Sequence, residues 1–143
     1  MNSVNPATMV MGRLLKSVSR MLAADGLRAS HFRLLAELAP TGTRITDLAD
    51  RLGMTKQACG QFVRHLEGTG HVTVEVPRDD RRARVVVRTT LGQRSAAAFV
   101  ARMTAIEQGW AEQVGPQRYQ TFRAVLAELG TSRPPGHPAE VVE

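Results

Sequence analysis

The sequence has few of the residues on which several common kinds of function depend. Among its 143 residues there is one cysteine, Cys59, so no disulfide can form within the chain and a reducing compartment is expected. Aromatic residues make up only 4% of the chain, which disfavours stacking on single-stranded bases. No apolar run approaches the ~20 residues that cross a bilayer, and the N-terminus lacks the regions of a signal peptide. These absences predict a cytoplasmic protein with no membrane partner.

Catalytic and metal-binding motifs are also missing. The chain has no Ser/His/Asp constellation, no Gly-rich phosphate loop and no paired-carboxylate motif, and His31 and His137 have no recognisable partners. A metal site could be considered at Cys59, His65 and His71. Cys59 and His65, however, are rotated by about 240° relative to each other around one helix and cannot bind the same ion. Cys59 lies on an apolar stripe, which predicts a buried and inert thiol. We therefore expect neither an enzyme nor a metal or cofactor site.

Positive charge, in contrast, is in excess. The formal net charge is +6, and Lys16 and Lys56 are the only lysines among the 19 basic residues. Arginine suits bidentate contacts with phosphate and guanine, which favours a nucleic-acid partner. A GC-rich genome would produce the same arginine bias, and the composition does not choose between these explanations.

Two amphipathic helices are predicted at the start of the chain. The first runs over about 6–24, where apolar residues recur at spacings of three and four. Ser30 is the expected N-cap of the second helix, which Pro40 and Gly42 end. The apolar residues of the two helices are Val10, Leu14, Val18, Met21, Leu22, Phe32, Leu34, Leu35 and Leu38.

A helix-turn-helix is predicted next. Thr46 is the expected cap of a short third helix that Gly53 ends. Thr55 is the expected cap of a fourth helix that runs to about Gly68. Two helices joined by a tight turn are typical of DNA-binding helix-turn-helix motifs.

A β-hairpin follows directly. Val72, Val74 and Val76 alternate with polar residues, 85–87 is the expected returning strand, and 77–83 forms the turn between them. The hairpin carries five arginines: Arg78, Arg81, Arg82, Arg84 and Arg88. A solvated charged loop would explain these arginines alone. Beside a helix-turn-helix, the hairpin is instead interpreted as the wing of a winged helix-turn-helix, which contacts phosphates and a minor groove.

Two further helices are expected after the hairpin. Thr89 is the predicted cap of a fifth helix of about 22 residues, Pro116 is suited to the first position of a sixth, and Gly130 ends it. Their apolar residues are Phe99, Met103, Ile106, Trp110, Tyr119, Phe122, Leu126 and Leu129. The tail 131–143 is predicted to be disordered. The terminal helices need a surface to cover their apolar faces, and a second copy of the chain is favoured over packing back on their own domain.

The fold class expected is therefore mainly α with a small β-hairpin wing. The predicted divisions are an N-terminal dimerisation helix (1–29), a winged helix-turn-helix (30–88), C-terminal dimerisation helices (89–130) and the tail (131–143).

The fourth helix has two distinct faces. Cys59, Phe62, Val63 and Leu66 form the predicted buried stripe. The opposite face shows side chains of the kinds that bind base edges and phosphates, namely Lys56, Gln57, Gln61 and Arg64, with Gly60 among them. In the hairpin, Asp79 and Asp80 interrupt the basic run. Asp80 is expected to pair with Arg82 or another neighbour and to shape the loop, although plain turn chemistry would also explain it.

The chain resembles the MarR family of bacterial transcription regulators. Three segments carry the resemblance: ITDLADRLGMT (45–55), HLEGTG (65–70) and PRDDRRARVVVRTTLG (77–92). The last segment contains the Asp-x-Arg element of the family as Asp80-Arg81-Arg82, followed by Thr89 at the start of a long helix. His71 and Arg88 depart from the pattern, because apolar residues usually stand there. The cysteine of the peroxide-sensing branch near the first helix is missing.

The resemblance implies a homodimer that recognises a pseudo-palindromic operator in double-stranded DNA. It implies major-groove contacts by 55–64 and a minor-groove contact by Arg82, and phosphate contacts are expected from the other wing arginines. The expected DNA-binding residues are Thr55, Lys56, Gln57, Gln61, Arg64, Arg78, Arg81, Arg82 and Arg84. The resemblance further implies repression that a small, often aromatic ligand relieves, although no motif marks its binding residues. The alternative is a winged-helix module that binds protein, or DNA without sequence preference.

Overall fold

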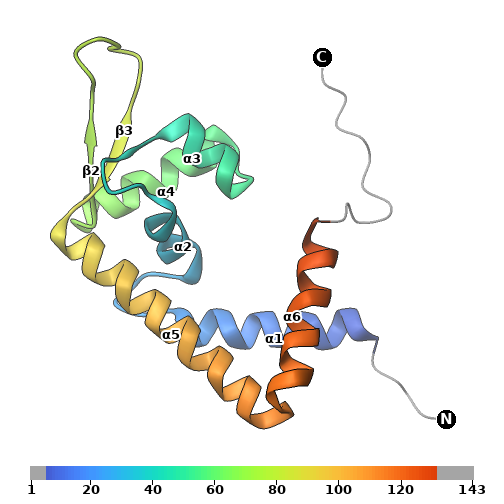
Figure 1. Ribbon diagram of the computed structural model, residues 1–143. Coiled ribbons are helices and arrows are strands. Elements are labelled where there is room, and N and C mark those ends of the chain that lie inside the picture. The colour runs from blue at the N-terminus through green and yellow to red at the C-terminus, as the bar shows by residue number, and fades with distance from the viewer. Residues whose placement is uncertain (1–5, 132–143) are drawn as a thin grey trace, which may run out of the picture. The chain divides into compact units, whose positions relative to one another are not determined.

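A computed structural model describes residues 6–131, and the chain up to Met103 forms one compact unit while Thr104 onward forms a second. The elements are α1 (Ala7–Leu22), α2 (Ala29–Glu37), β1 (Thr43–Arg44), α3 (Ile45–Leu52), α4 (Lys56–Gly68), β2 (Val72–Glu75), β3 (Val85–Arg88), α5 (Thr90–Val114) and α6 (Pro116–Thr131). The fold class predicted from the sequence is confirmed, because the structure is mainly helical with one small antiparallel sheet (Figure 1). Within residues 6–131, no helix is both long enough and apolar enough to span a bilayer.

The second helix starts two residues earlier than the sequence pattern predicts. Ser30 was expected to be its N-cap, but α2 begins at Ala29 and Arg28 is the N-cap. The backbone N–H of Arg28 donates to Nδ1 of His31 at 3.1 Å, so a ring nitrogen of histidine supplies the cap acceptor. The prediction of Ser30 was wrong because histidine is not among the usual capping residues.

The helix-turn-helix forms as predicted, with one change at its start. Thr46 was expected to cap α3, but the helix begins at Ile45 with Arg44 as its N-cap. Arg44 is extended because it belongs to the short strand β1, which the sequence did not reveal. Gly53 ends α3 in the left-handed conformation at φ 63°, and the Thr55 hydroxyl accepts the N–H of Ala58 at 3.1 Å. The tight turn and the start of α4 are therefore confirmed.

The sheet has three antiparallel strands in the order β1-β3-β2. Val86 lies opposite Thr43 of β1 and Val74 of β2, so it occupies the centre of the sheet and is fully buried. The wing consists of β2, β3 and the connecting residues 76–84, and it extends beside α3 and α4 (Figure 1). Strand β1 ties the base of the wing to the start of the helix-turn-helix.

The core of the first unit lies between α2, α3, α4 and the sheet. Its largest fully buried side chains are Phe32, Leu27, Leu34, Leu35, Leu48, Leu66, Val63, Val72, Val86 and Cys59. Burying a side chain of this size contributes roughly 1.5–3 kcal/mol. The start of α5 belongs to this unit, because Phe99 stacks on Phe32 with ring centroids 5.5 Å apart. Phe62 was expected on the buried stripe of α4, but it is only half-buried, since it faces His31 at the edge of the core.

Thr89 caps α5 as predicted and also joins it to the end of α4. Its hydroxyl accepts the N–H of Gly92 at 3.1 Å and donates to the carbonyl of Gly70 at 2.6 Å. Gly92 is buried against the backbone carbonyl of His71, where a Cβ atom would collide. The start of α5 therefore depends on a glycine that permits close backbone contact.

The second unit is a helical hairpin of the end of α5 and all of α6. Gly115 turns the chain at φ 92°, and Pro116 takes the first position of α6 as predicted. The Tyr119 hydroxyl donates to the Glu107 carboxylate at 2.7 Å, and the rings of Trp110 and Phe122 meet edge to face. The helix continues through Thr131, one residue beyond the predicted end. The rest of the predicted tail, 132–143, lies outside the described residues.

Candidate nucleic-acid interface

Helix α4 separates its apolar and polar residues as the sequence predicts. Cys59, Val63 and Leu66 are buried against the core. The predicted DNA-binding side chains of this segment are all exposed: Thr55, Lys56, Gln57, Gln61 and Arg64. A Cβ atom at Gly60 would meet only the Arg64 guanidinium, at 3.8 Å, so this glycine is not required by crowding within the chain. The helix thus presents an uninterrupted polar surface of amide and cationic groups.

Cys59 points away from that surface. Its Sγ atom lies 4.0 Å from the backbone carbonyl of Ile45, its side chain is fully buried, and this burial raises the pKa of the thiol. A buried thiol with a raised pKa is a poor nucleophile and a poor metal ligand. Across the described residues 6–131, no three His, Cys, Asp or Glu side chains lie together as a metal site requires.

The tip of the wing is organised around Asp80. Its Oδ1 atom accepts the backbone N–H of Arg82 at 3.1 Å, while Oδ2 pairs with Nη1 of Arg44 at 3.1 Å. The Arg82 hydrogen bond and then the Arg44 guanidinium hold the pKa of the Asp80 carboxyl below its usual range. The carboxylate therefore stays ionised at neutral pH and fixes the turn, as a shaping role predicts.

The partners of Asp80 differ in part from the sequence prediction. Asp80 accepts the backbone N–H of Arg82, and the ion pair of its carboxylate is with Arg44, while the Arg82 side chain is exposed. Arg44 was not predicted to take part in the site. It lies 36 residues from Asp80 in the sequence, and only the pairing of β1 with β3 brings it to the wing.

The wing arginines do not have equivalent surroundings. Arg78, Arg81 and Arg82 are exposed. Arg84 is also exposed, but its Nη1 donates to the carbonyls of Arg81 and Ala83 at 2.9 and 3.1 Å, so it also shapes the loop.

Arg88, at the end of β3, is half-buried and lies away from the tip. Its Nη1 atom donates to the carbonyl of Leu35 in α2 at 3.0 Å. This contact ties the base of the wing to α2. Arg88 is therefore a structural arginine, unlike the four nearer the tip.

A shallow cavity of about 210 Å³ separates the tip of the wing from the start of α3. It is lined by Arg44, Ile45, Thr46, Asp80, Arg82, Ala83 and Arg84. Three of these side chains are cationic, and Asp80 is the single anion among them. Thr46, which was expected to be a helix cap, thus lines a basic depression beside the wing.

Part of the winged helix-turn-helix matches a known family in sequence. Residues 25–83 match the family model described as "MarR family". These residues, less than half of the chain, are therefore similar to the MarR family. The match covers α2, the helix-turn-helix and the tip of the wing, which includes the Asp80 turn.

Several solved structures share the fold of this chain over most of its length. The PcaV transcriptional regulator from Streptomyces coelicolor, in complex with its natural ligand, has 15% sequence identity and a TM-score of 0.75, covering 91% of this chain and 97% of its own. The transcriptional repressor CouR, bound to a 23-mer DNA duplex, has 21% identity and a TM-score of 0.75, with coverages of 87% and 92%. The S. aureus MepR–DNA complex has 19% identity and a TM-score of 0.71, with coverages of 85% and 91%. None of the curated proteins matches the chain in sequence.

Proposed function

We propose that this protein is a dimeric, sequence-specific DNA-binding transcriptional regulator. The observation that carries the proposal is the pairing of two exposed polar elements in one compact unit. One is the outer face of α4, and the other is a wing whose turn is held by Asp80 while the guanidinium of Arg82 faces solvent. Helix α4 has the size and the polar surface of a helix that enters a major groove.

Base and phosphate contacts are assigned to different residues. The side-chain amides of Gln57 and Gln61 can each form two hydrogen bonds with an adenine, and Arg64 can bind guanine or phosphate. Arg82 enters the adjoining minor groove. Lys56, Arg78, Arg81 and Arg84 contact phosphates, and the Thr55 hydroxyl lies at the N-terminus of α4, where backbone phosphates bind favourably.

A two-fold homodimer places two copies of this interface on one operator. Both terminal helices have exposed apolar side chains: Met9, Val10, Met11, Leu14, Leu15 and Met21 on α1, and Phe122, Val125, Leu126 and Leu129 on α6. Apolar surface of this extent is typical of a protein interface. The operator is then a pseudo-palindrome whose half-sites lie about 34–36 Å apart, or a multiple of that distance.

Repression relieved by a small, possibly aromatic effector is the proposed mode of control. Its support is the fold shared with PcaV, which was solved with its natural ligand, and with CouR, described as a repressor. A winged-helix module that binds DNA without sequence preference is the second candidate. The exposed wing arginines favour it, because phosphate contacts carry no sequence information.

Selection from a random duplex library distinguishes the two candidates. The full-length protein is expected to enrich a single motif with two-fold symmetry. The same selection with Arg82→Ala should retain the base preference at the half-site centres and lose the base preference at the operator flanks. A library that stays random after several rounds, despite measurable binding, would support the non-specific module.

A further inference from the structure

His31, which had no assigned role, lies near two other histidines of the winged domain. The ring centroids of His31 on α2 and His65 on α4 are 4.7 Å apart, with the rings tilted by 34°. His31 also meets the ring of Phe62 edge to face at 5.0 Å. His71, just before β2, is close enough to act electrostatically on His31. The prediction that His31 has no partner was therefore wrong, whereas His137 lies outside the described residues.

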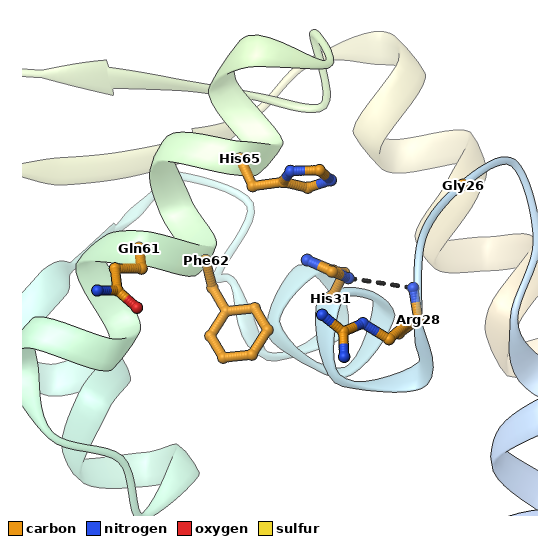
Figure 2. Close-up of a pocket in the computed structure, with 6 residues that line it drawn as sticks. All are labelled: Gly26, Arg28, His31, Gln61, Phe62 and His65. Atoms are coloured by element: carbon orange, nitrogen blue, oxygen red, sulfur yellow. Dashed lines mark hydrogen bonds between the residues drawn. The ribbon is translucent and has the colours of Figure 1, made fainter.

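His31 takes part in a hydrogen bond that fixes its protonation state. Its Nδ1 atom accepts the backbone N–H of Arg28, the N-cap of α2, at 3.1 Å (Figure 2). In the usual capping box a Gln or Glu at the third helical position plays this part. Because Nδ1 must accept, the neutral ring carries its proton on Nε2. His31 thus caps α2 only as a neutral imidazole.

Protonation of His31 is opposed from every side that it faces. The side chain is only 6% exposed, and a proton on Nδ1 would point at the N–H of Arg28. The charged and titratable groups around it are the guanidinium of Arg28 in the α1–α2 turn, His65 on α4 and His71 before β2. Burial, followed by His65, Arg28 and His71, lowers the pKa of His31 below 6.5. The folded state therefore loses stability as the pH falls through about 6.5 towards this lower value.

The same contact supports the proposed DNA-binding surface. His65 lies one helical turn after Gln61 and next to Arg64, so a shift of His65 displaces both side chains. Gln61, His65 and Phe62 line a cavity of about 300 Å³ together with Gly26, Arg28 and His31 (Figure 2). The cavity gives the rings of α4 room to move when the His31 contact is lost.

We propose that neutral His31 positions α4 through His65 and Phe62, and that protonation of His31 weakens DNA binding in mildly acidic solution. This inference rests on the proposed DNA-binding function. His31 is a positioning residue, because it acts on DNA through α4. The proposal has an unusual sign: histidine protonation ordinarily adds cationic charge and strengthens attraction to phosphates.

The test compares the wild type with His31→Gln on one operator duplex, between about pH 8 and pH 5.5, at constant ionic strength. Glutamine can accept the Arg28 N–H but does not titrate in this range. The Kd of the wild type is expected to rise with falling pH by up to about tenfold per pH unit, the limit that release of one proton on binding sets. The Kd of the variant should change by less than about twofold over the same range.

Nitrogen-15 NMR of the imidazole rings gives a second measurement that needs no variant. Nδ1 of His31 should have the shift of an unprotonated nitrogen at pH 8, and its protonation should follow the loss of DNA affinity. Wild-type binding that strengthens or stays constant on acidification, or the same weakening in His31→Gln, would overturn the inference. A wild type that binds no DNA at pH 8 would instead refute the proposed function, and the NMR measurement would still report on the His31 cap.

Discussion

Nη1 of Arg44 lies 3.1 Å from Oδ2 of Asp80, and this ion pair joins the start of the helix-turn-helix to the tip of the wing. Both side chains are close to half exposed, at 48% and 42%. An exposed pair contributes at most about 1 kcal/mol to the free energy of unfolding. Its significance is therefore geometric: it sets where the wing arginines lie relative to α4.

Replacing Arg44 by alanine should affect DNA binding more than folding. The thermal midpoint is expected to move by only a few degrees, because the pair is solvated. The affinity for DNA should fall by about two- to tenfold, because without the ion pair the wing is more mobile and must be ordered on binding. Fluorescence anisotropy with an operator duplex measures the change. Arg33→Ala, which removes an exposed arginine from α2, is the matched control and should bind within about twofold of wild type.

Arg82 and Gln61 should have separable effects on specificity. Loss of Arg82 removes the minor-groove contact, so discrimination should relax at the operator flanks. Loss of Gln61 removes a base contact in the major groove, so discrimination should relax within the half-sites. Each alanine variant is expected to lose about 1–3 kcal/mol of binding free energy. Binding to a set of single-base operator variants measures both, and identical profiles for the two proteins would show that the interface has been assigned wrongly.

Two glycines of α5 should respond in opposite ways to alanine. At Gly92 the new Cβ atom would collide with the carbonyl of His71, so Gly92→Ala should lower the free energy of unfolding by about 1–3 kcal/mol. At Gly109 a Cβ atom meets nothing within 4 Å, and Gly109→Ala should raise stability by about 0.5–1 kcal/mol through helix propensity. Urea denaturation of both variants is the measurement. A stable Gly92→Ala protein would contradict the close contact at the start of α5.

The proposed dimer should depend on the apolar face of α6. Leu126→Glu places a charge among Phe122, Leu129 and their neighbours, and should convert the protein into a monomer in sedimentation velocity experiments. Gln120→Glu, an exposed polar position on the same helix, carries the same charge change and should remain dimeric. Wild-type protein that sediments as a monomer at micromolar concentration would refute the dimer itself.

Local signals explain what could be predicted from the sequence. Gly53 and Thr55 identify the turn of the helix-turn-helix because a left-handed glycine and a hydroxyl cap act within a few residues. Thr89 and Pro116 identify helix starts for the same reason. The exposed face of α4 follows from helical periodicity alone. These features required no knowledge of tertiary contacts.

Most features that the sequence did not predict depend on distant residues. Strand β1 is two residues long, too short for a periodic pattern, and its pairing with β3 brings Arg44 to Asp80. The contact of His31 with His65 joins two helices that are separated by the whole of α3. Thr46 and Ser30 were expected to be caps because their residue types favour that position. Instead, α3 starts after Arg44, which pairs with β3. Helix α2 starts after Arg28, whose N–H donates to the ring of His31.

Competition binding at about 150 mM salt tests the central claim most directly. A labelled operator duplex is displaced from the wild-type protein by unlabelled operator or by a scrambled duplex of the same composition. The unlabelled operator is expected to displace the label at a concentration at least about 10³-fold lower than the scrambled duplex needs, which is the lower end of the ratio between specific and non-specific affinity. Equal competition by the two duplexes would contradict sequence-specific recognition by α4 and the wing.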